Sequence, residues 1–362
     1  ENQDFVEICK LHNIKFIGPS SEVMEKMADK SKAKEEMVRA GVPVVPGSKG
    51  AVRTLDEGKK IAREIGYPIM AKASAGGGGR GMRLIKEEKD FDSQYLAASS
   101  EALAAFGDGT MYLERFINNP RHIEVQVIGD SHGNAIHIGE RDCSLQRRHQ
   151  KVIEESPAIL LNDETRAKLH EVAVKATKYL KYEGAGTFEF LADDKQNIYF
   201  MEMNTRLQVE HPVSEMVSGL DIIEWMIKVA EGEKLPPQES IRFRGHAIEC
   251  RITAEDPNNF LPCPGKITQW MVPGGRNVRV DSHIYTNYIV PPYYDSMIGK
   301  LIVWGRDREK AINIMKRALS EFEVEGIKTN IPFHKKMMEN KDFISNNYDT
   351  KYLENYKGLD SI

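Results

Sequence analysis

The fold of this chain is constrained most by two alternating segments that flank a run of turn-forming residues. Residues 186–192 (Gly-Thr-Phe-Glu-Phe-Leu-Ala) and 200–212 (Phe-Met-Glu-Met-Asn-Thr-Arg-Leu-Gln-Val-Glu-His-Pro) stand on either side of 193–197 (Asp-Asp-Lys-Gln-Asn). Alternating runs joined by such turn residues are typical of an antiparallel hairpin. Pairing Glu189 with Glu202 centres the turn within 193–197, so we expect that register.

The second segment of this hairpin carries polar side chains at every other position. Alternate residues of a strand share a face, which predicts one polar row. That row is Glu202, Asn204, Arg206 and Gln208. Met201 and Met203 are then expected to face a core. Glu189, Glu202 and Asn204 converge as oxygen ligands, which suits Mg²⁺ carrying a nucleotide phosphate. The alternative, a solvated face with scattered acids, does not explain the amides and the guanidinium.

Composition limits the class of protein. A chain of 362 residues can bury a large core and form two or more structural units. Its 50 Lys and Arg against 54 Asp and Glu argue against a nucleic-acid binder that works through bulk charge. The chain shows no signal peptide and no apolar run of the roughly 20 residues that span a bilayer, so no membrane partner is expected. The cysteines lack zinc spacing and suit a reducing cytosol, which predicts a cytoplasmic protein.

Periodicity and turn residues predict the remaining elements. Helices are expected over 5–11, 20–39, 55–65, 88–106, 163–182, 213–231 and 308–322. Strands are expected at 14–18, 67–73, 82–85, 111–117, 122–128 and 135–140, with further short strands over 241–304. The strand at 14–18 is apolar and expected to be buried.

A glycine-rich segment lies between two of these strands. It runs Ser-Ala-Gly-Gly-Gly-Gly-Arg-Gly over 74–81 and follows Lys72. Backbone N–H groups without Cβ atoms can close over phosphates, although a flexible linker has a similar composition. Its four consecutive glycines are Gly76, Gly77, Gly78 and Gly79. No Gly-Lys-Ser/Thr opens a helix after it and strands flank it, which excludes a P-loop and a Rossmann fingerprint.

A cationic segment follows the strand expected at 135–140. Residues 140–151 include Arg147, Arg148, His149 and Lys151. Because the whole chain is slightly acidic, small anions are better partners for this segment than a polyanion. His149 equally fits a structural histidine. Lys30, Glu114 and Arg251 carry little signal by themselves.

Six segments together resemble one family, the biotin carboxylases, which are the ATP-grasp subunits of acetyl-CoA carboxylase and its relatives. They run nearly end to end in family order: 72–82, 119–126, 140–151, 202–212, 250–257 and 291–300. The resemblance implies an α+β chain with an ATP-grasp domain over 20–240, whose mobile glycine-rich lid covers about 46–117. It also implies a biotin carboxylase C-terminal domain over 241–362. Residues 1–19 would be the remnant of an α/β N-terminal domain.

The resemblance also implies roles for individual residues. Nucleotide contacts would come from Lys30, Lys72, Gly76, Gly77, Gly78, Gly79, Glu114, His122, Gln146 and His149. Two Mg²⁺ or Mn²⁺ sites would use Glu189, Glu202 and Asn204. Bicarbonate would contact Lys151, Arg206, Gln208 and Val209. Glu210 would be the general base and Arg251 the cation that stabilises the enolate of biotin, with Lys151 and Arg206 also catalytic.

The implied reaction is the ATP- and bicarbonate-dependent carboxylation of biotin through carboxyphosphate, the first half-reaction of acetyl-CoA carboxylase in fatty acid synthesis. The chain has no Ala-Met-Lys-Met motif, so biotin is expected on a separate carrier protein, with carboxyltransferase subunits as further partners. Members of the family carry roughly a hundred residues before the ATP-grasp core. We expect a homodimer at full length, and lower stability and activity for these 362 residues alone. Two alternatives are another ATP-grasp ligase and a non-catalytic nucleotide-binding fragment.

Overall fold

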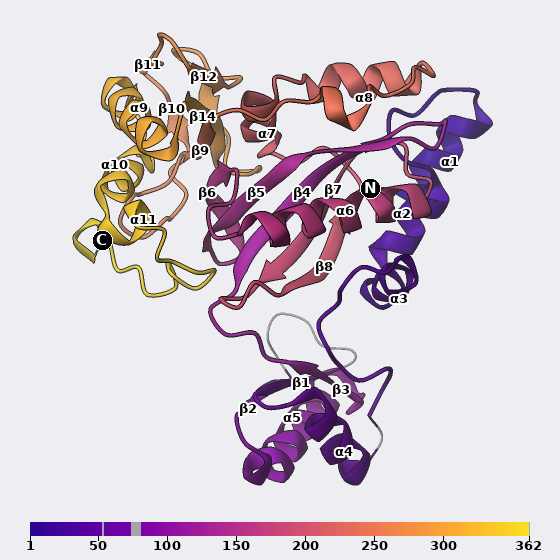
Figure 1. Ribbon diagram of the computed structural model, residues 1–362. Coiled ribbons are helices and arrows are strands. Elements are labelled where there is room, and N and C mark those ends of the chain that lie inside the picture. Colours follow the sequence, from indigo (N-terminus) through magenta and orange to yellow (C-terminus); the bar gives the residue numbers. More distant parts are fainter. Residues whose placement is uncertain (53, 74–80, 362) are drawn as a thin grey trace. The chain divides into compact units, whose positions relative to one another are not determined.

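The protein is described by a computed structural model that covers residues 1–52, 54–73 and 81–361 (Figure 1). It divides into two compact units, Glu1–Val42 with Asn119–Ile362, and Pro43–Asn118. Helices and antiparallel strands occur in both, in agreement with the predicted α+β class. The range predicted as a lid lies within the second unit. Among the helices of the described ranges, none combines the length and apolar character needed to cross a bilayer.

An eight-stranded antiparallel sheet organises the first unit, in the order β12-β14-β9-β6-β5-β4-β7-β8. Its strands are β4 (Arg121–Gly129), β5 (Ala135–Arg147), β6 (Gln150–Ser156), β7 (Gly184–Ala192), β8 (Ile198–Asn204), β9 (His246–Thr253), β12 (Val278–Asp281) and β14 (Met297–Gly305). Two small ladders pair β10 (Gly265–Lys266) with β13 (Ile289–Val290), and β11 (Gln269–Met271) with β15 (Glu323–Glu325). The sheet thus joins the part predicted as ATP-grasp to the part predicted as the C-terminal domain.

The helices of the first unit pack on this sheet and around its ends (Figure 1). They are α1 (Gln3–Leu11), α2 (Ser21–Ala28), α3 (Lys30–Ala40), α6 (Asp163–Tyr179), α7 (His211–Ser218), α8 (Ile222–Ala230), α9 (Arg308–Glu321), α10 (Ile331–Glu339) and α11 (Lys341–Ile344), with the 3-10 turns η2 (Gln238–Ser240) and η3 (Leu359–Ser361). Gly129 of β4 faces Thr177 of α6, whereas Ile128 clusters with Ile222 of α8. Because neighbouring residues of a strand point to opposite faces, α6 and α8 cover opposite sides of the sheet.

The second unit is a three-stranded sheet with two helices. Its strands pair in the order β2-β1-β3, and its elements are α4 (Leu55–Ile65), β1 (Ile69–Ala73), β2 (Met82–Ile85), η1 (Glu88–Asp90), α5 (Phe91–Phe106) and β3 (Met111–Arg115). Alternation in β1 buries Ile69 and Ala71 against a core that includes Phe91 and Leu113, and leaves Lys72 on the other face. β1 begins two residues later and β3 ends two residues earlier than predicted, and the other elements match the predicted strands and helices closely.

The strand predicted at 14–18 is wrong. Residues in this segment lie in turns and irregular backbone, and Ile14 and Ile17 are 60% and 45% exposed. A strand needs a partner for its backbone groups, and among the described residues none pairs with this segment. Phe16 instead packs edge-to-face on Phe5 of α1.

Two predicted long helices are each interrupted. The helix expected over 20–39 breaks at Asp29, whose carboxylate accepts a hydrogen bond from the N–H of Lys32 and so caps a new helix, α3. The helix expected over 213–231 breaks after α7 at Gly219, which adopts a left-handed conformation. Apolar periodicity continues across both breaks, which is why the pattern alone did not locate them.

Candidate active site

The hairpin that the sequence predicted is formed by β7 and β8. Glu189 and Glu202 are Cα partners, so the predicted register is confirmed. A bulge between this pair and the next leaves Met201 without a partner, and Met201 lines the same cavity as Glu202. The expectation that Met201 faces the core is therefore wrong, whereas Met203 is buried as expected. β8 ends at Asn204, so Arg206 and Gln208 belong to the following loop and not to the strand.

A cavity of about 960 Å³ opens beside this hairpin and continues along β6 and β9. It brings together the predicted site residues of the first unit whose side chains are described. These are His122, Gln146, His149, Lys151, Glu189, Glu202, Asn204, Arg206, Gln208, Val209, Glu210 and Arg251. Residues from six strands and two loops thus share one space.

The other predicted nucleotide contacts lie elsewhere in the chain. Lys72 and Glu114 occupy neighbouring strands of the second unit, and their side chains form an ion pair at 2.5 Å. Lys30 is the first residue of α3, not a mid-helix residue as expected, and its side chain lies outside the described part of the structure. Gly76, Gly77, Gly78 and Gly79 also lie outside the described residues.

Lys151 of β6 is the central cation of the cavity. Its Nζ lies 2.6 Å from Glu124, 2.9 Å from Glu189 and 2.6 Å from Glu210. Burial disfavours a charged ammonium, but the surrounding carboxylates raise the pKa of Lys151 well above its ordinary value. Lys151 is therefore a fixed positive charge.

Glu210 connects this lysine to Arg251. The residue precedes α7, and its carboxylate is almost fully buried. One oxygen accepts from Lys151, and the other accepts from a terminal nitrogen of Arg251 at 3.0 Å. The Nε of Arg251 donates to Glu154 at 2.5 Å. A carboxylate held between two cations, at the wall of a cavity, is placed to exchange a proton with a small bound molecule.

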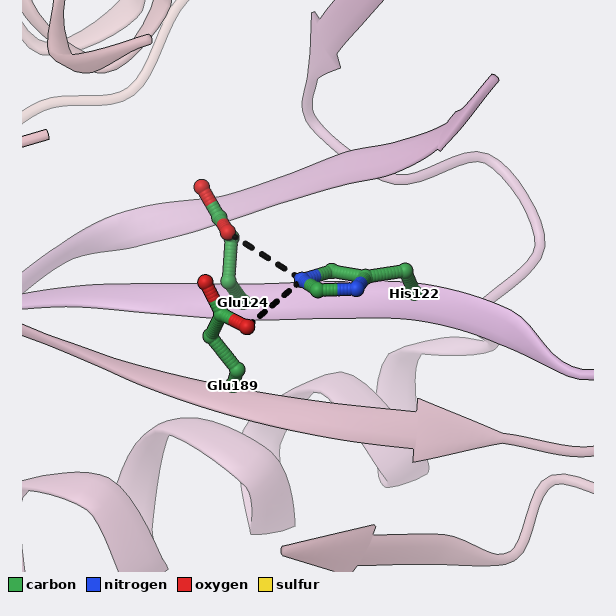
Figure 2. A group of neighbouring side chains, drawn as sticks. All are labelled: His122, Glu124 and Glu189. Carbon is green, nitrogen blue, oxygen red and sulfur yellow. Dashed lines mark ion pairs between the residues drawn. The ribbon is translucent and has the colours of Figure 1, made fainter. Parts of the chain in front are cut away.

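His122 lies between two of the acidic residues (Figure 2). Its Nε2 is 3.4 Å from Glu124 and 3.2 Å from Glu189. Burial opposes a charged imidazole, but the contacts with these carboxylates raise the pKa of His122 to about 9. Ligand atoms of the three residues lie within 4.8 Å of one another, a spacing that suits a cation. The ammonium of Lys151 contacts both carboxylates, so a cation of this chain already occupies the position.

The predicted metal ligands fit a hard divalent ion by their chemistry. Glu189, Glu202 and Asn204 supply carboxylate and amide oxygens at one end of the cavity, which is the donor set that Mg²⁺ prefers. One oxygen of Glu189 accepts from Asn204 at 3.0 Å and from Gln208 at 2.8 Å. Burial opposes its charge, but His122 and Lys151 lower the pKa of Glu189 to about 2, so it is ionised at neutral pH.

Three further predicted residues line the cavity. Arg206 is half exposed and pairs with Glu1 at 2.8 Å. His149 is exposed and takes a left-handed conformation, with φ 65°, in the turn between β5 and β6. Gln146 ends the preceding strand and donates to the carbonyl of Cys143 at 2.8 Å. None of these side chains contacts Glu210 directly within the described residues.

Three residues that the sequence did not single out support the cavity from behind. Arg141 is fully buried and donates to Glu124 at 2.6 Å and to Gln208 at 3.0 Å. Lys300 of β14 donates to the carbonyl of Val209 at 2.8 Å. Glu124 alternates with His122 on β4, so the same two-residue period that identified the hairpin could have identified it.

Comparison with known proteins places the chain among close relatives. Residues 29–238 match the family described as carbamoyl-phosphate synthase L chain, ATP binding domain, and residues 249–355 match the biotin carboxylase C-terminal domain. A biotin carboxylase of Nostoc sp. is 55% identical over 356 residues, which make up 98% of this chain and 80% of that protein.

Solved structures show the same likeness. The biotin carboxylase–βγ-ATP complex from Campylobacter jejuni has 68% sequence identity and a TM-score of 0.87, with 98% of this chain and 79% of that chain covered. The biotin carboxylase domain dimer of Hydrogenobacter thermophilus 2-oxoglutarate carboxylase, in complex with MgADP, ADP and bicarbonate, has 51% identity and a TM-score of 0.85, with 98% and 78% covered.

Proposed function

The chain belongs to the biotin carboxylase family of ATP-dependent ligases, and we propose that it catalyses the first half-reaction of acetyl-CoA carboxylase in fatty acid synthesis. In this reaction bicarbonate is activated by ATP and its carbon is transferred to biotin. The observation that carries the proposal is the carboxylate of Glu210, held between Lys151 and Arg251. The cavity around it brings a candidate base, candidate anion-binding groups and candidate metal ligands together.

We assign the activation of bicarbonate to four side chains of the cavity and to the backbone of one further residue. Bicarbonate is a weak nucleophile, and loss of its proton to Glu210 makes it a better one. Lys151 and Arg206 offset the negative charge that develops, together with the amide of Gln208 and the backbone of Val209. An oxygen of the deprotonated bicarbonate then attacks the γ-phosphorus of ATP. A new P–O bond forms as the bond to ADP breaks, which gives carboxyphosphate and ADP.

Arg251 serves the second chemical step in this proposal. Carboxyphosphate breaks down to CO₂ and phosphate, and the phosphate takes the ureido proton of biotin. The biotin nitrogen then forms a bond to the carbon of CO₂. Negative charge on the ureido oxygen is offset by Arg251, which lies at the wall of the same cavity.

Mg²⁺ would be held by Glu189, Glu202 and Asn204, and when bound it neutralises charge on the transferred phosphoryl group. We propose the nucleotide contacts on the ground of the family resemblance. They are Lys30, Lys72, Gly76, Gly77, Gly78, Gly79, Glu114, His122, Gln146 and His149. Cations and backbone amides of the chain would orient the phosphates.

The acceptor and the partners belong to the same proposal. The solved Hydrogenobacter relative is part of a 2-oxoglutarate carboxylase, so family membership is compatible with more than one final acceptor. We propose acetyl-CoA, a biotin carboxyl carrier protein and carboxyltransferase subunits in the cytoplasm. The dimer seen for that relative supports a homodimer here, and its bound MgADP supports Mg²⁺ as the metal.

The proposal is tested by measuring ADP release with biotin, bicarbonate and Mg²⁺ each present or omitted. We expect release that depends on all three. Release without any dependence on biotin would favour another ATP-grasp ligase, and binding of ATP without turnover would favour a non-catalytic fragment. Supplying the carrier and carboxyltransferase with acetyl-CoA, 2-oxoglutarate or pyruvate then identifies the acceptor. Malonyl-CoA as the main product supports the proposal, and another carboxylated product overturns the assignment of acetyl-CoA as the acceptor.

A further inference from the structure

Two buried carboxyl groups lie side by side behind the cavity. Glu154 of β6 and Glu249 of β9 are Cα partners on adjacent antiparallel strands, so their side chains point to the same face. Both residues have zero solvent exposure. Directly opposite residues have Cβ atoms about 4.5–5.5 Å apart, which lets two carboxyl groups meet.

Their oxygens are unevenly satisfied. One oxygen of Glu154 accepts from Arg251 at 2.5 Å. Its other oxygen and both oxygens of Glu249 lack hydrogen-bond partners within the described residues. A buried acceptor without a donor is costly, and the two facing acids can relieve that cost only if one of them carries a proton.

The surrounding charges agree with one shared proton. Arg251 follows Glu249 by two residues on β9, and Lys300 is the Cα partner of Arg251 on β14. These two cations favour a charged Glu249, whereas Glu154 and Glu210 disfavour it. Burial and the nearby Glu154 carboxylate raise the pKa of Glu249 well above its ordinary value. Burial likewise raises the pKa of Glu154, to about 7, although Arg251 opposes the shift. Glu154 accepts a hydrogen bond from Arg251 and Glu249 accepts none within the described residues, so Glu249 is the acid that retains a proton more readily.

We propose that Glu249 is a neutral acid that donates a hydrogen bond to Glu154, and that the pair positions Arg251 for the carboxylation of biotin. The donated bond satisfies the free oxygen of Glu154 and leaves its charge on the oxygen that faces Arg251. Glu154 then holds the Nε edge of the guanidinium, while a terminal nitrogen reaches Glu210. Glu154 and Glu249 are positioning residues, since neither lines the cavity. The functional part of this inference rests on the proposed role of Arg251.

The protonation of Glu249 is tested by a measurement that does not depend on activity. Infrared difference spectra of the protein with and without ¹³C-labelled glutamate detect the carbonyl stretch of a protonated glutamic acid at neutral pH. We expect such a band in the wild type and its loss in Glu249→Gln, but not in Glu239→Gln, whose side chain is exposed. Absence of the band in the wild type overturns the proposal. Its persistence in Glu249→Gln with loss in Glu154→Gln also overturns it, because the proton would then belong to Glu154.

The positioning role is tested by a double-mutant cycle between Glu154→Gln and Arg251→Lys. We expect Glu154→Gln to lower the kcat of biotin carboxylation roughly ten- to hundredfold, the range for a lost hydrogen bond to a charged group. The KM for ATP should be unchanged, and the double variant should be little worse than Arg251→Lys alone. Additive losses, or an equal rise in the KM for ATP, overturn the role. If the wild type carboxylates no biotin, the proposed function is wrong and the double-mutant cycle cannot be measured. The infrared spectra still show whether Glu249 is protonated.

Glu249→Leu against Glu249→Gln separates the hydrogen bond from simple packing. Glutamine is neutral and keeps a donor toward Glu154, whereas leucine of similar size has none. We expect the leucine variant to lose at least threefold more kcat than the glutamine variant at equal thermal stability. Equal kcat in the two variants would overturn the donated hydrogen bond.

Discussion

The Nζ of Lys151 and the Oε1 of Glu210 lie 2.6 Å apart, although β6 and the loop before α7 are distant in sequence. An ammonium has three protons to donate, and Lys151 directs them to Glu124, Glu189 and Glu210. In the proposed reaction, bicarbonate would therefore contact Lys151 by replacing one of these bonds. Glu210 is the proposed base, and a proton taken from the substrate would weaken its attraction to the lysine. In the proposed reaction, binding and deprotonation of bicarbonate would thus be coupled at this pair.

We expect Glu210→Gln to abolish bicarbonate-dependent ATP cleavage while nucleotide affinity stays near that of the wild type. Loss of a general base typically costs about 10²–10⁴ in rate. Glutamine keeps the size of the side chain but cannot take the proton. ADP release and the Kd for ATP are the two measurements. Near wild-type turnover would remove Glu210 from this role.

Metal dependence provides a second prediction. Glu189→Ala and Glu202→Ala should each lose Mg²⁺-dependent activity, and the double variant should be little worse than either single one, because residues of one site do not contribute additively. The measurement is activity against Mg²⁺ concentration. Glu239→Ala, which changes an exposed carboxylate, is the control. An unchanged half-saturation in one single variant would exclude that residue from the site.

The sequence pattern predicted those features of the site that depend on interactions within a single hairpin. The register of Glu189 with Glu202 follows from turn residues and a two-residue period, and both act within one hairpin. The bulge at Met201 and the end of β8 at Asn204 depend on packing against other strands, so the same pattern extended the strand too far. Arg141 could not be identified in this way, because a buried arginine and a surface arginine look alike in sequence.

The bounds of the longer helices and of segment 14–18 also depend on features that the apolar pattern does not contain. The helices around Asp29 and Gly219 were joined in prediction because their apolar residues continue in phase, whereas a capping bond and a left-handed glycine interrupt them. The apolar segment 14–18 has the composition of a strand, but a strand also requires a neighbour that no local pattern supplies. Apart from the candidate metal ligands Glu189, Glu202 and Asn204, roles of individual side chains were predicted only through family resemblance. Glu124 could also have been predicted as a site residue, because it lies two residues after His122 on the same strand.

Acid stability should depend on Glu140. This buried carboxylate contacts Arg166 at 2.8 Å and His170 at 2.6 Å. Burial opposes its charge, but His170 and Arg166 lower the pKa of Glu140 to about 2 from an ordinary 4.5. A lowered carboxyl pKa stabilises the fold above pH 4.5, and this contribution is lost as the pH falls from 4.5 toward 2. This lowering of the pKa of Glu140 corresponds to roughly 3 kcal/mol in the free energy of unfolding.

We therefore expect Glu140→Gln to lower the free energy of unfolding at pH 7 by about 3 kcal/mol and to flatten its fall below pH 4.5. Chemical denaturation at several pH values measures both effects. Glu239→Gln is the matched control, since it removes an exposed carboxylate of the same size. Unfolding curves of Glu140→Gln that run parallel to those of the wild type across this pH range would contradict the assignment.

Lys300 provides the last prediction, which concerns the backbone of the loop before α7, where we propose that bicarbonate binds. Its ammonium donates to the carbonyl of Val209 at 2.8 Å, and Asp281 lies 3.7 Å away. Lys300→Met keeps most of the side-chain volume but removes the bond that holds this loop. We expect the KM for bicarbonate to rise roughly tenfold, as for a lost hydrogen bond to a charged group, with little change in the KM for ATP. Lys336→Met on the exposed face of α10 is the control for loss of one charge. If Lys300→Met folds with wild-type stability and its KM for bicarbonate is unaltered, the carbonyl of Val209 does not need Lys300, and the other contacts of this loop, such as those of Gln208 with Arg141 and Glu189, are sufficient to hold it.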